Sequence, residues 1–326
     1  IRSLYKEITS ENLSNTIVSN IKESDTPKDW VKVVLNHYGC RMKLWAFFLR
    51  IIISSLGMYE LNTLDQFVFK PCTVLSDKPK ISIVIPCSGS SILMLERCVS
   101  HVMCSCMEFK HGVKLTVSCD FCPEIVKWCE EKGIDCVVSG KAKRKGFSVS
   151  CNLGAAHAIK PSTEYVIFLN DDCFIGKDTI LKMYEFIELN KSIGICSPAF
   201  LWMDGSIQEC GTRIYEDGRT DWIGCFKNKS DIQENPPYVS ATCAMFRKRL
   251  FQEIGGFDTQ FDMYYEDVDM CMKAKKQGYQ LEYVKNCHVH HSHSFIGGLF
   301  DPNVKSWGKD HIDASRNLFY KKWMSN

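Results

Sequence analysis

From residue 81 onward the chain alternates short β-branched segments with amphipathic segments, and this alternation constrains its fold more than any other feature. The strand-like segments are 81–86 (ISIVIP), 113–118 (VKLTVS), 135–140 (DCVVSG) and 165–170 (YVIFLN). Helix-like segments lie between them, around 91–105, 123–132 and 148–159. Because strands that are apolar at nearly every position are buried on both faces, the pattern predicts a mostly parallel, doubly wound α/β sheet with helices on both faces.

The first 79 residues have a different pattern. Apolar positions recur there at helical spacing, and a turn-rich connector with Pro71 and Pro79 ends the segment. We therefore expect a helical extension of unassigned role over 1–79 and one α/β domain over 80–326, a size that single α/β domains commonly reach.

The most apolar stretch lies inside this extension, at 44–59 (LWAFFLRIIISSLGMY). It is shorter than the roughly 20 residues that span a bilayer and has Arg50 near its middle, so a transmembrane helix is not expected. A helix packed on the main domain is the favoured interpretation, and contact with a membrane surface is the alternative. The sequence begins with Ile1 and shows no signal peptide. We expect part of a longer, multidomain chain that works in the cytoplasm or on the cytoplasmic face of a membrane.

Composition narrows the class of protein. The 40 Lys and Arg residues against 38 Asp and Glu give a net charge of +2, so no basic field indicates a nucleic-acid partner. Of the 18 cysteines, Cys196, Cys243, Cys271 and Cys287 sit singly inside apolar runs, which favours reduced, buried thiols over disulfides. The weaker alternative is a zinc site on Cys104, Cys106, Cys119 and Cys122.

Oxygen-bearing side chains follow the strand-like segment 165–170. Asn170, Asp171 and Asp172 stand where a parallel strand opens onto the crevice in which such sheets bind ligands. Hard oxygen ligands suit Mg²⁺ or Mn²⁺. The same three residues also make a good turn and helix N-cap, so both interpretations stay open on spacing alone.

A second acidic group begins the helix that we expect from Glu266 to Gly278. Carboxylates at Glu266, Asp267 and Asp269 fall in the first helical turn, where the helix dipole favours them. Helix capping is the simpler explanation, but three carboxylates in four positions exceed what capping needs.

Histidines follow the strand expected at 281–284. They are His288, His290, His291 and His293, and alternation along an extended segment places His291 and His293 on one face. A solvated turn, an isolated zinc site and a ligand to the same metal as Asp172 are all open interpretations.

Five segments occur in the order typical of the GT-A-fold inverting glycosyltransferases of family 2, and the chain resembles the rhamnosyltransferase-like branch of that family over about 80–295. The segments are ISIVIP, KGFSVSCNLGAAHA (145–158), FLNDDC, DGSIQECG and GGFDTQFDMYYEDVDMCMKAKKQGY. The resemblance implies a Rossmann-like GT-A catalytic domain over 80–326. It also implies single-displacement transfer of a sugar from a nucleotide-sugar, UDP- or dTDP-linked, to a hydroxyl of a glycan or glycoconjugate.

The resemblance implies roles for individual residues as well. Asp267 matches the general base, and Glu266 would orient the acceptor or the base. Asp172 matches a ligand of Mn²⁺ or Mg²⁺, with His291 completing the site and His293 and His290 as fallbacks. The positions expected to contact the donor are Pro86, Cys87, Asp120, Arg144, Lys145, Gly146, Asn152, Asn170 and Asp171.

Two departures from the family pattern keep other functions open. Asn170 replaces the first Asp of the D-x-D position, and Cys87-Ser88-Gly89 replaces the usual polar turn after Pro86. A catalytically silent module that binds a nucleotide-sugar or a glycan is therefore one alternative. A sugar nucleotidyltransferase is another, although the segment after the first strand lacks the basic residue that such an enzyme needs.

Overall fold

The computed structural model describes residues 75–88, 91–120, 122–139, 146–203, 205–224, 232–292 and 307–325. The expected helical extension over 1–79 is described only from residue 75, so its apolar stretch 44–59 lies outside the described residues. Three predicted site residues, Arg144, Lys145 and His293, also lie outside them. Leu75 already pairs with Val113 beside the sheet, and the domain boundary near 79 stays a prediction. Within the described ranges, no helix combines the length and the apolar character needed to cross a bilayer.

Strands and helices alternate as the sequence pattern predicts. The strands are β1 (Ile81–Cys87), β2 (Val113–Cys119), β3 (Asp135–Val138), β4 (Tyr165–Leu169), β5 (Cys173–Ile175), β6 (Ile193–Leu201), β7 (Ile207–Glu209), β8 (Gly211–Ile214), β9 (Thr220–Ile223), β10 (Cys243–Arg247) and β11 (Gln280–His291). The helices are α5 (Ile92–Glu108), α6 (Pro123–Lys132), α7 (Phe147–Ala158), α8 (Thr179–Leu189), α9 (Lys248–Glu253), α10 (Glu266–Lys276) and α11 (Trp307–Trp323).

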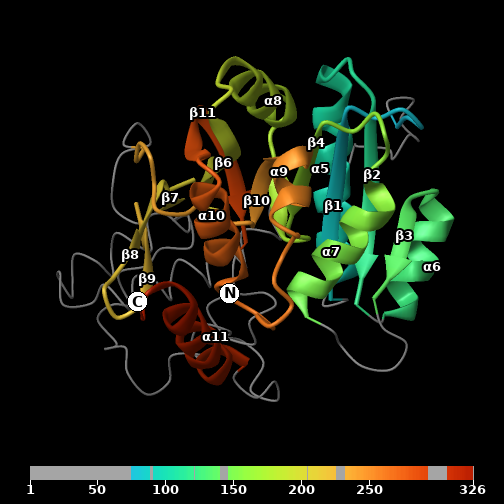
Figure 1. Ribbon diagram of the computed structural model, residues 1–326. Coiled ribbons are helices and arrows are strands. Elements are labelled where there is room, and N and C mark those ends of the chain that lie inside the picture. The colour runs from blue at the N-terminus through green and yellow to red at the C-terminus, as the bar shows by residue number, and fades with distance from the viewer. Residues whose placement is uncertain are drawn as a thin grey trace, which may run out of the picture.

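The strands form a mixed, mostly parallel sheet in the order β3-β2-β1-β4-β10-β6-β11-β5, with β7 added beside β6 (Figure 1). Four neighbouring strands, β3, β2, β1 and β4, run parallel to one another. Strand β11 runs parallel to β6. Antiparallel β10 lies between β4 and β6, so β11 points the same way as β4. The carboxyl ends of β1, β2, β4 and β11 therefore meet at one edge, and the α/β prediction is confirmed.

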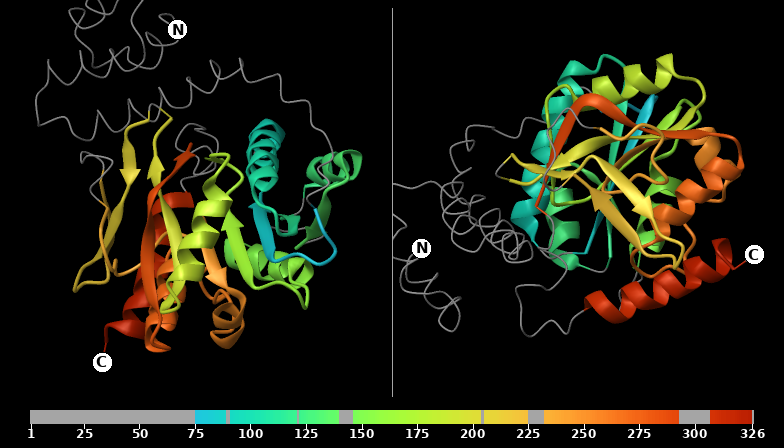
Figure 2. Two further views of the ribbon diagram at one scale, coloured as in Figure 1. Left: turned by 90° about the horizontal axis from the view of Figure 1, so that it is seen from above. Right: turned by 90° about the vertical axis from the view of Figure 1, so that its left-hand side faces the viewer.

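Helices cover both faces of the sheet (Figures 1 and 2). Along β1 the alternation of side chains places Ile83 in the core beneath α5, α6 and α8, and places Val84 in the opposite core beneath α7, α9, α10 and α11. Fully burying such a side chain contributes roughly 1.5–3 kcal/mol. The sheet is thus held from both sides, as continuous apolar strands require.

The last helix, α11, braces α10 through one carboxylate. Asp269 of α10 is fully buried and contacts Lys273 at 2.9 Å and Lys322 of α11 at 2.7 Å. Trp323 Nε1 also donates to Asp269 Oδ1 at 2.8 Å. Asp269 therefore has its charge partners inside the fold, unlike its neighbours at the start of α10.

The cysteines of the described ranges are in the thiol form, and most of them are buried. Cys196 and Cys243 lie in one core, and Cys151 and Cys271 lie in the other, where each packs among aliphatic and aromatic side chains. These four thiols therefore behave as small hydrophobic residues.

Candidate active site

The metal candidate residues lie where β4 and β11 end. Asn170 follows β4, and its N–H donates to the Thr242 carbonyl oxygen at 2.8 Å. The turn through Asp172 then leads into the short strand β5, which pairs antiparallel with the end of β11 so that Cys173 lies opposite His291. This pairing joins two segments more than a hundred residues apart and brings His291 beside Cys173.

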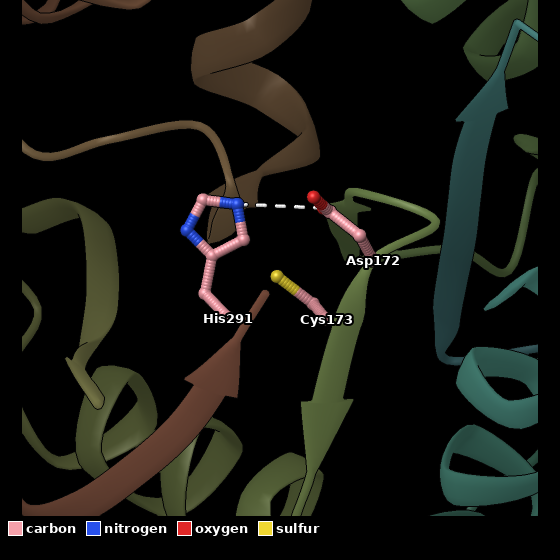
Figure 3. A group of neighbouring side chains, drawn as sticks. All are labelled: Asp172, Cys173 and His291. Carbon is pink, nitrogen blue, oxygen red and sulfur yellow. Dashed lines mark ion pairs between the residues drawn. The ribbon is translucent and has the colours of Figure 1, made fainter. Parts of the chain in front are cut away.

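Asp172 and His291 face each other in a buried setting. His291 Nε2 lies 3.4 Å from Asp172 Oδ1, and the two residues are 5% and 4% exposed (Figure 3). Gln208 of β7 orients the imidazole ring. Its Nε2 donates to the His291 carbonyl oxygen at 3.3 Å, which leaves its Oε1 to accept from His291 Nδ1 at 2.7 Å.

This arrangement leaves Nε2 of the neutral imidazole as an acceptor aimed at a carboxylate oxygen. Two acceptors that face each other suit a shared divalent cation, and a partner that holds the second nitrogen is the usual support of a ligating histidine. Asp172, Cys173 and His291 form the one group among the described residues whose ligand atoms all lie within 4.8 Å of one another. Cys104, Cys106, Cys119 and Cys122 are all described and form no such group, so the alternative zinc site there is wrong.

The acidic start of α10 is held by an unusual backbone. Tyr264 and Tyr265 have φ angles of +66° and +67°, in the left-handed region, where a non-glycine residue costs on the order of 1–3 kcal/mol. Tyr265 is fixed by its ring, which packs on Phe319 with 5.5 Å between centroids. The two residues turn the chain abruptly so that α10 begins at Glu266, where the sequence predicts it.

Asp267 and Glu266 have unlike environments. Asp267 accepts from the Val268 N–H at 2.8 Å and from the Ala241 N–H at 3.4 Å, and burial raises its pKa from 3.8 to about 6. Burial, reinforced by the charge of Asp267, raises the pKa of Glu266 well above its ordinary value. The two carboxyls therefore differ in proton affinity, as carboxyl pairs do where enzymes divide acid and base roles.

Three of the predicted donor-binding residues converge where β1 and β2 end. Asp120 donates its N–H to the Cys87 carbonyl oxygen at 2.8 Å. Its carboxylate accepts from Ser139 Oγ at 2.9 Å and from the Gly146 N–H at 3.1 Å. Gly146 has a φ of +92°, and a Cβ there would lie 2.6 Å from Asp262 Oδ1. Pro86, beside Ser118 in the sheet register, completes this edge, and the donor-binding role of the group stays a prediction.

The side chain of Asn152 forms hydrogen bonds with the backbone of Phe257. Its Oδ1 accepts from the Phe257 N–H at 2.9 Å, and its Nδ2 donates to the Phe257 carbonyl oxygen at 2.8 Å. The side chain thus secures the loop that leads to α10. No contact in the described residues supports a donor-binding role for it, which stays an untested prediction.

Two buried polar residues of β7 were not anticipated from the sequence. Gln208 orients His291, as described above. Glu209 is 2% exposed, accepts from the Tyr283 hydroxyl at 2.6 Å, and has a pKa that burial raises to about 8. The segment DGSIQECG indicates only a hairpin, although a Gln-Glu pair between apolar neighbours is itself a sign of buried polar function.

Comparison with known proteins gives one family. Residues 165–319 match the family described as glycosyl transferase family group 2. The low-salt glycan biosynthesis hexosyltransferase Agl10 of Haloferax volcanii is 26% identical over 160 residues, which are 47% of this chain and 50% of that protein. The rhamnosyltransferase WbbL of Escherichia coli K12 is 26% identical over 200 residues, which are 56% and 73% of the two chains.

A third relative is the N-acetylglucosaminyl-diphospho-decaprenol L-rhamnosyltransferase of Mycobacterium tuberculosis, which is 32% identical over 148 residues. That match covers 40% of this chain and 48% of the relative, so the chain spans about half the length of this protein and of the Haloferax protein.

Among solved structures, GalNAc-T7 with UDP, GalNAc and Mn²⁺ has a TM-score of 0.51 at 14% identity. The match covers 65% of this chain and 43% of that one. At this identity the likeness concerns the fold alone, and it agrees with the GT-A expectation, which is confirmed.

Proposed function

We propose that this chain, which is similar to glycosyltransferase family 2 proteins and to rhamnosyltransferases among them, transfers a sugar from a nucleotide-sugar to a hydroxyl of a glycan or glycoconjugate. One observation carries the proposal. The carboxyl edge of the sheet holds a buried Asp172–His291 pair suited to a divalent cation, and the nearby start of α10 presents a carboxylate whose pKa is raised to about 6. The names of the relatives, a hexosyltransferase and rhamnosyltransferases, support a hexosyl or deoxyhexosyl donor. A UDP- or dTDP-linked sugar is the proposed form of that donor.

Asp267 would act as the general base. As the acceptor oxygen forms its bond to the anomeric carbon, its proton passes to the Asp267 carboxylate, the bond to the diphosphate oxygen breaks, and the nucleoside diphosphate leaves with inversion at that carbon. A pKa of about 6 suits this step, because the carboxylate is ionised at neutral pH and is still a stronger base than an ordinary Asp. Such a base contributes about 10²–10⁴-fold in rate.

Glu266 would orient the acceptor. Burial and the adjacent Asp267 charge raise the pKa of its carboxyl, and in its protonated form the carboxyl can donate a hydrogen bond as well as accept one. Its Oε2 is buried and has no hydrogen-bond partner among the described residues. A substrate hydroxyl would satisfy that atom.

Asp172 and His291 would hold the metal, Mn²⁺ or Mg²⁺, with Asn170 and Asp171 beside them. When bound, the ion supplies a positive charge that stabilises the leaving diphosphate. The buried Oδ1 of Asn170 has no hydrogen-bond partner among the described residues, which fits a site that a ligand completes.

Asp120, with Pro86, Cys87 and Gly146, would contact the nucleotide at the ends of β1 and β2. The matched family region begins at residue 165, and we extend the catalytic domain to 80–326 because β1, β2 and β3 belong to the same sheet as β4, the first strand of that region. A cytoplasmic location, where nucleotide-sugars are made, completes the proposal.

The test is a panel of UDP- and dTDP-sugars, assayed for nucleoside diphosphate release with and without Mn²⁺, with the anomeric configuration of the product read by NMR. Asp267→Asn should keep donor binding and lose at least about 100-fold in turnover. Asp217→Asn, on the exposed turn between β8 and β9, is the matched control and should leave turnover unchanged. Unchanged turnover in Asp267→Asn would refute the base assignment, and donor binding without turnover across the panel would indicate the silent binding module.

A further inference from the structure

The thiol of Cys173 belongs to the geometry of the metal site. Cys173 is fully buried at the start of β5, and its Sγ lies within 4.8 Å of the ligand atoms of Asp172 and His291. Figure 3 shows the sulfur directed toward the space between the imidazole ring and the carboxylate. Its hydrogen bond to the Thr242 carbonyl oxygen is long, with Sγ and the oxygen 3.6 Å apart, so little holds the thiol away from an ion.

The spacing of the other two ligands fits a tetrahedral ion. Ligands at bond lengths of about 2.0–2.1 Å stand about 3.3 Å apart along an edge of a tetrahedron. The observed separation of His291 Nε2 and Asp172 Oδ1 is 3.4 Å. Gln208 already holds the ring with Nε2 directed at that position, so two ligands need almost no movement and only the thiol must approach.

We propose that Cys173 is a third protein ligand of this site, and that in the absence of donor the site takes a thiophilic divalent ion, Zn²⁺ above all, ahead of Mn²⁺ or Mg²⁺. The inference rests on the proposed function in taking Asp172 and His291 as metal ligands. The chemistry is a ligand exchange: the Cys173 S–H bond breaks, the proton passes to solvent, and the sulfur bonds to the ion. Sulfur and imidazole ligands favour zinc over manganese, whereas an all-oxygen set favours magnesium and manganese.

This ligand set has a consequence for the reaction. A tetrahedral ion held by three side chains keeps one open position. Two oxygens of a diphosphate need two positions, which a six-coordinate ion can offer. Zinc at the three-ligand site would therefore compete with the ion that supports donor binding, and zinc would act as an inhibitor that a chelator reverses.

Cobalt titration tests the proposal without donor or turnover. Co²⁺ replaces Zn²⁺ in tetrahedral sites, and bonding to a thiolate gives an intense near-ultraviolet charge-transfer band. The metal-free wild-type protein should develop this band with one equivalent of Co²⁺ and lose it when Zn²⁺ is added. Cys173→Ser should lack the band, and its zinc affinity, measured by competition with a chelating dye, should fall at least about tenfold.

Two further variants make the result specific. Cys122→Ser removes a partly exposed thiol at the start of α6, outside the ligand set, and should keep the band. Cys173→Ala checks the serine variant, and far-ultraviolet circular dichroism confirms that both fold. A wild-type protein without the band, or a band that survives in both Cys173 variants, would overturn the proposal.

The two proposals fail separately. Mn²⁺-dependent donor binding in a protein without the cobalt band refutes the thiol ligand and keeps the proposed function. The band in a protein that neither binds nor turns over any nucleotide-sugar keeps the thiol ligand and refutes the proposed function.

Discussion

Replacing the base Asp267 by Asn should stabilise the protein in a pH-dependent way. Burial raises the pKa of Asp267 from 3.8 to about 6. A raised pKa in the folded state means that the group favours folding below pH 3.8 and that this contribution is lost as the pH rises through 6. At about 1.36 kcal/mol per unit, the ionised carboxylate costs the wild-type protein about 3 kcal/mol at neutral pH, a cost that an uncharged amide does not have.

The pH dependence separates the cost of the Asp267 charge from the loss of hydrogen bonds in the Asn variant. The amide side chain would also weaken the hydrogen bonds from Val268 and Ala241, but those losses are the same at every pH. Between pH 4.5 and 7.5, the advantage of Asp267→Asn in the free energy of unfolding should grow by about 2 kcal/mol. Removing the Asp267 charge also relieves Glu266, which acts in the same direction.

The assay is urea or thermal unfolding of both proteins at half-unit pH steps. A change of about 2 kcal/mol corresponds to roughly 4–8 °C in Tm for a domain of this size. Asp269→Asn, two residues along the same helix, is the control with the opposite sign. It should destabilise the protein by about 2 kcal/mol at neutral pH, because Lys273, Lys322 and Trp323 lose a charged partner. A difference between wild type and Asp267→Asn that stays flat across the pH range would refute the raised pKa.

Three further predictions concern Asp267, Gln208 and Arg247. Turnover in wild type should fall on the acid side with a midpoint near pH 6, as Asp267 takes up its proton, and a midpoint near 4 in the pH–rate profile would contradict this. Gln208→Leu should weaken Mn²⁺ binding about 10–100-fold in a metal titration, because His291 Nδ1 loses its acceptor, and unchanged affinity would exclude His291 as a ligand. Arg247→Met should lower the free energy of unfolding by about 2–3 kcal/mol, because the guanidinium donates to the carbonyl oxygens of Ile187, Asn190 and Ile193; a urea midpoint equal to that of wild type would contradict it.

Local signals placed some elements well. The helix α10 begins at the predicted Glu266, because acidic residues in a first turn and a closing Gly278 are local features that the sequence displays directly. The predicted strand 281–284 was too short, since β11 continues to His291. That continuation depends on pairing with β6 and β5, a tertiary feature that no local pattern contains.

In the candidate site, too, some residues follow from local sequence patterns and others depend on tertiary pairing. The position of Asp172 follows from the parallel-strand rule, because ligands meet the carboxyl ends of such strands. Local alternation places His291 and His293 on one face, and only the β5–β11 pairing shows that His291 lies opposite Cys173. The engagement of Asn152 with Phe257, 105 residues away, is likewise invisible in the sequence.

The most direct test of the account is the metal dependence of donor binding, measured by calorimetry with the best nucleotide-sugar of the panel. The account predicts that Mn²⁺ strengthens binding to wild type and to Asp267→Asn, and that Asp172→Asn abolishes the effect of Mn²⁺. Equal donor affinity with and without Mn²⁺ in wild type, or an undiminished effect of Mn²⁺ in Asp172→Asn, would contradict it.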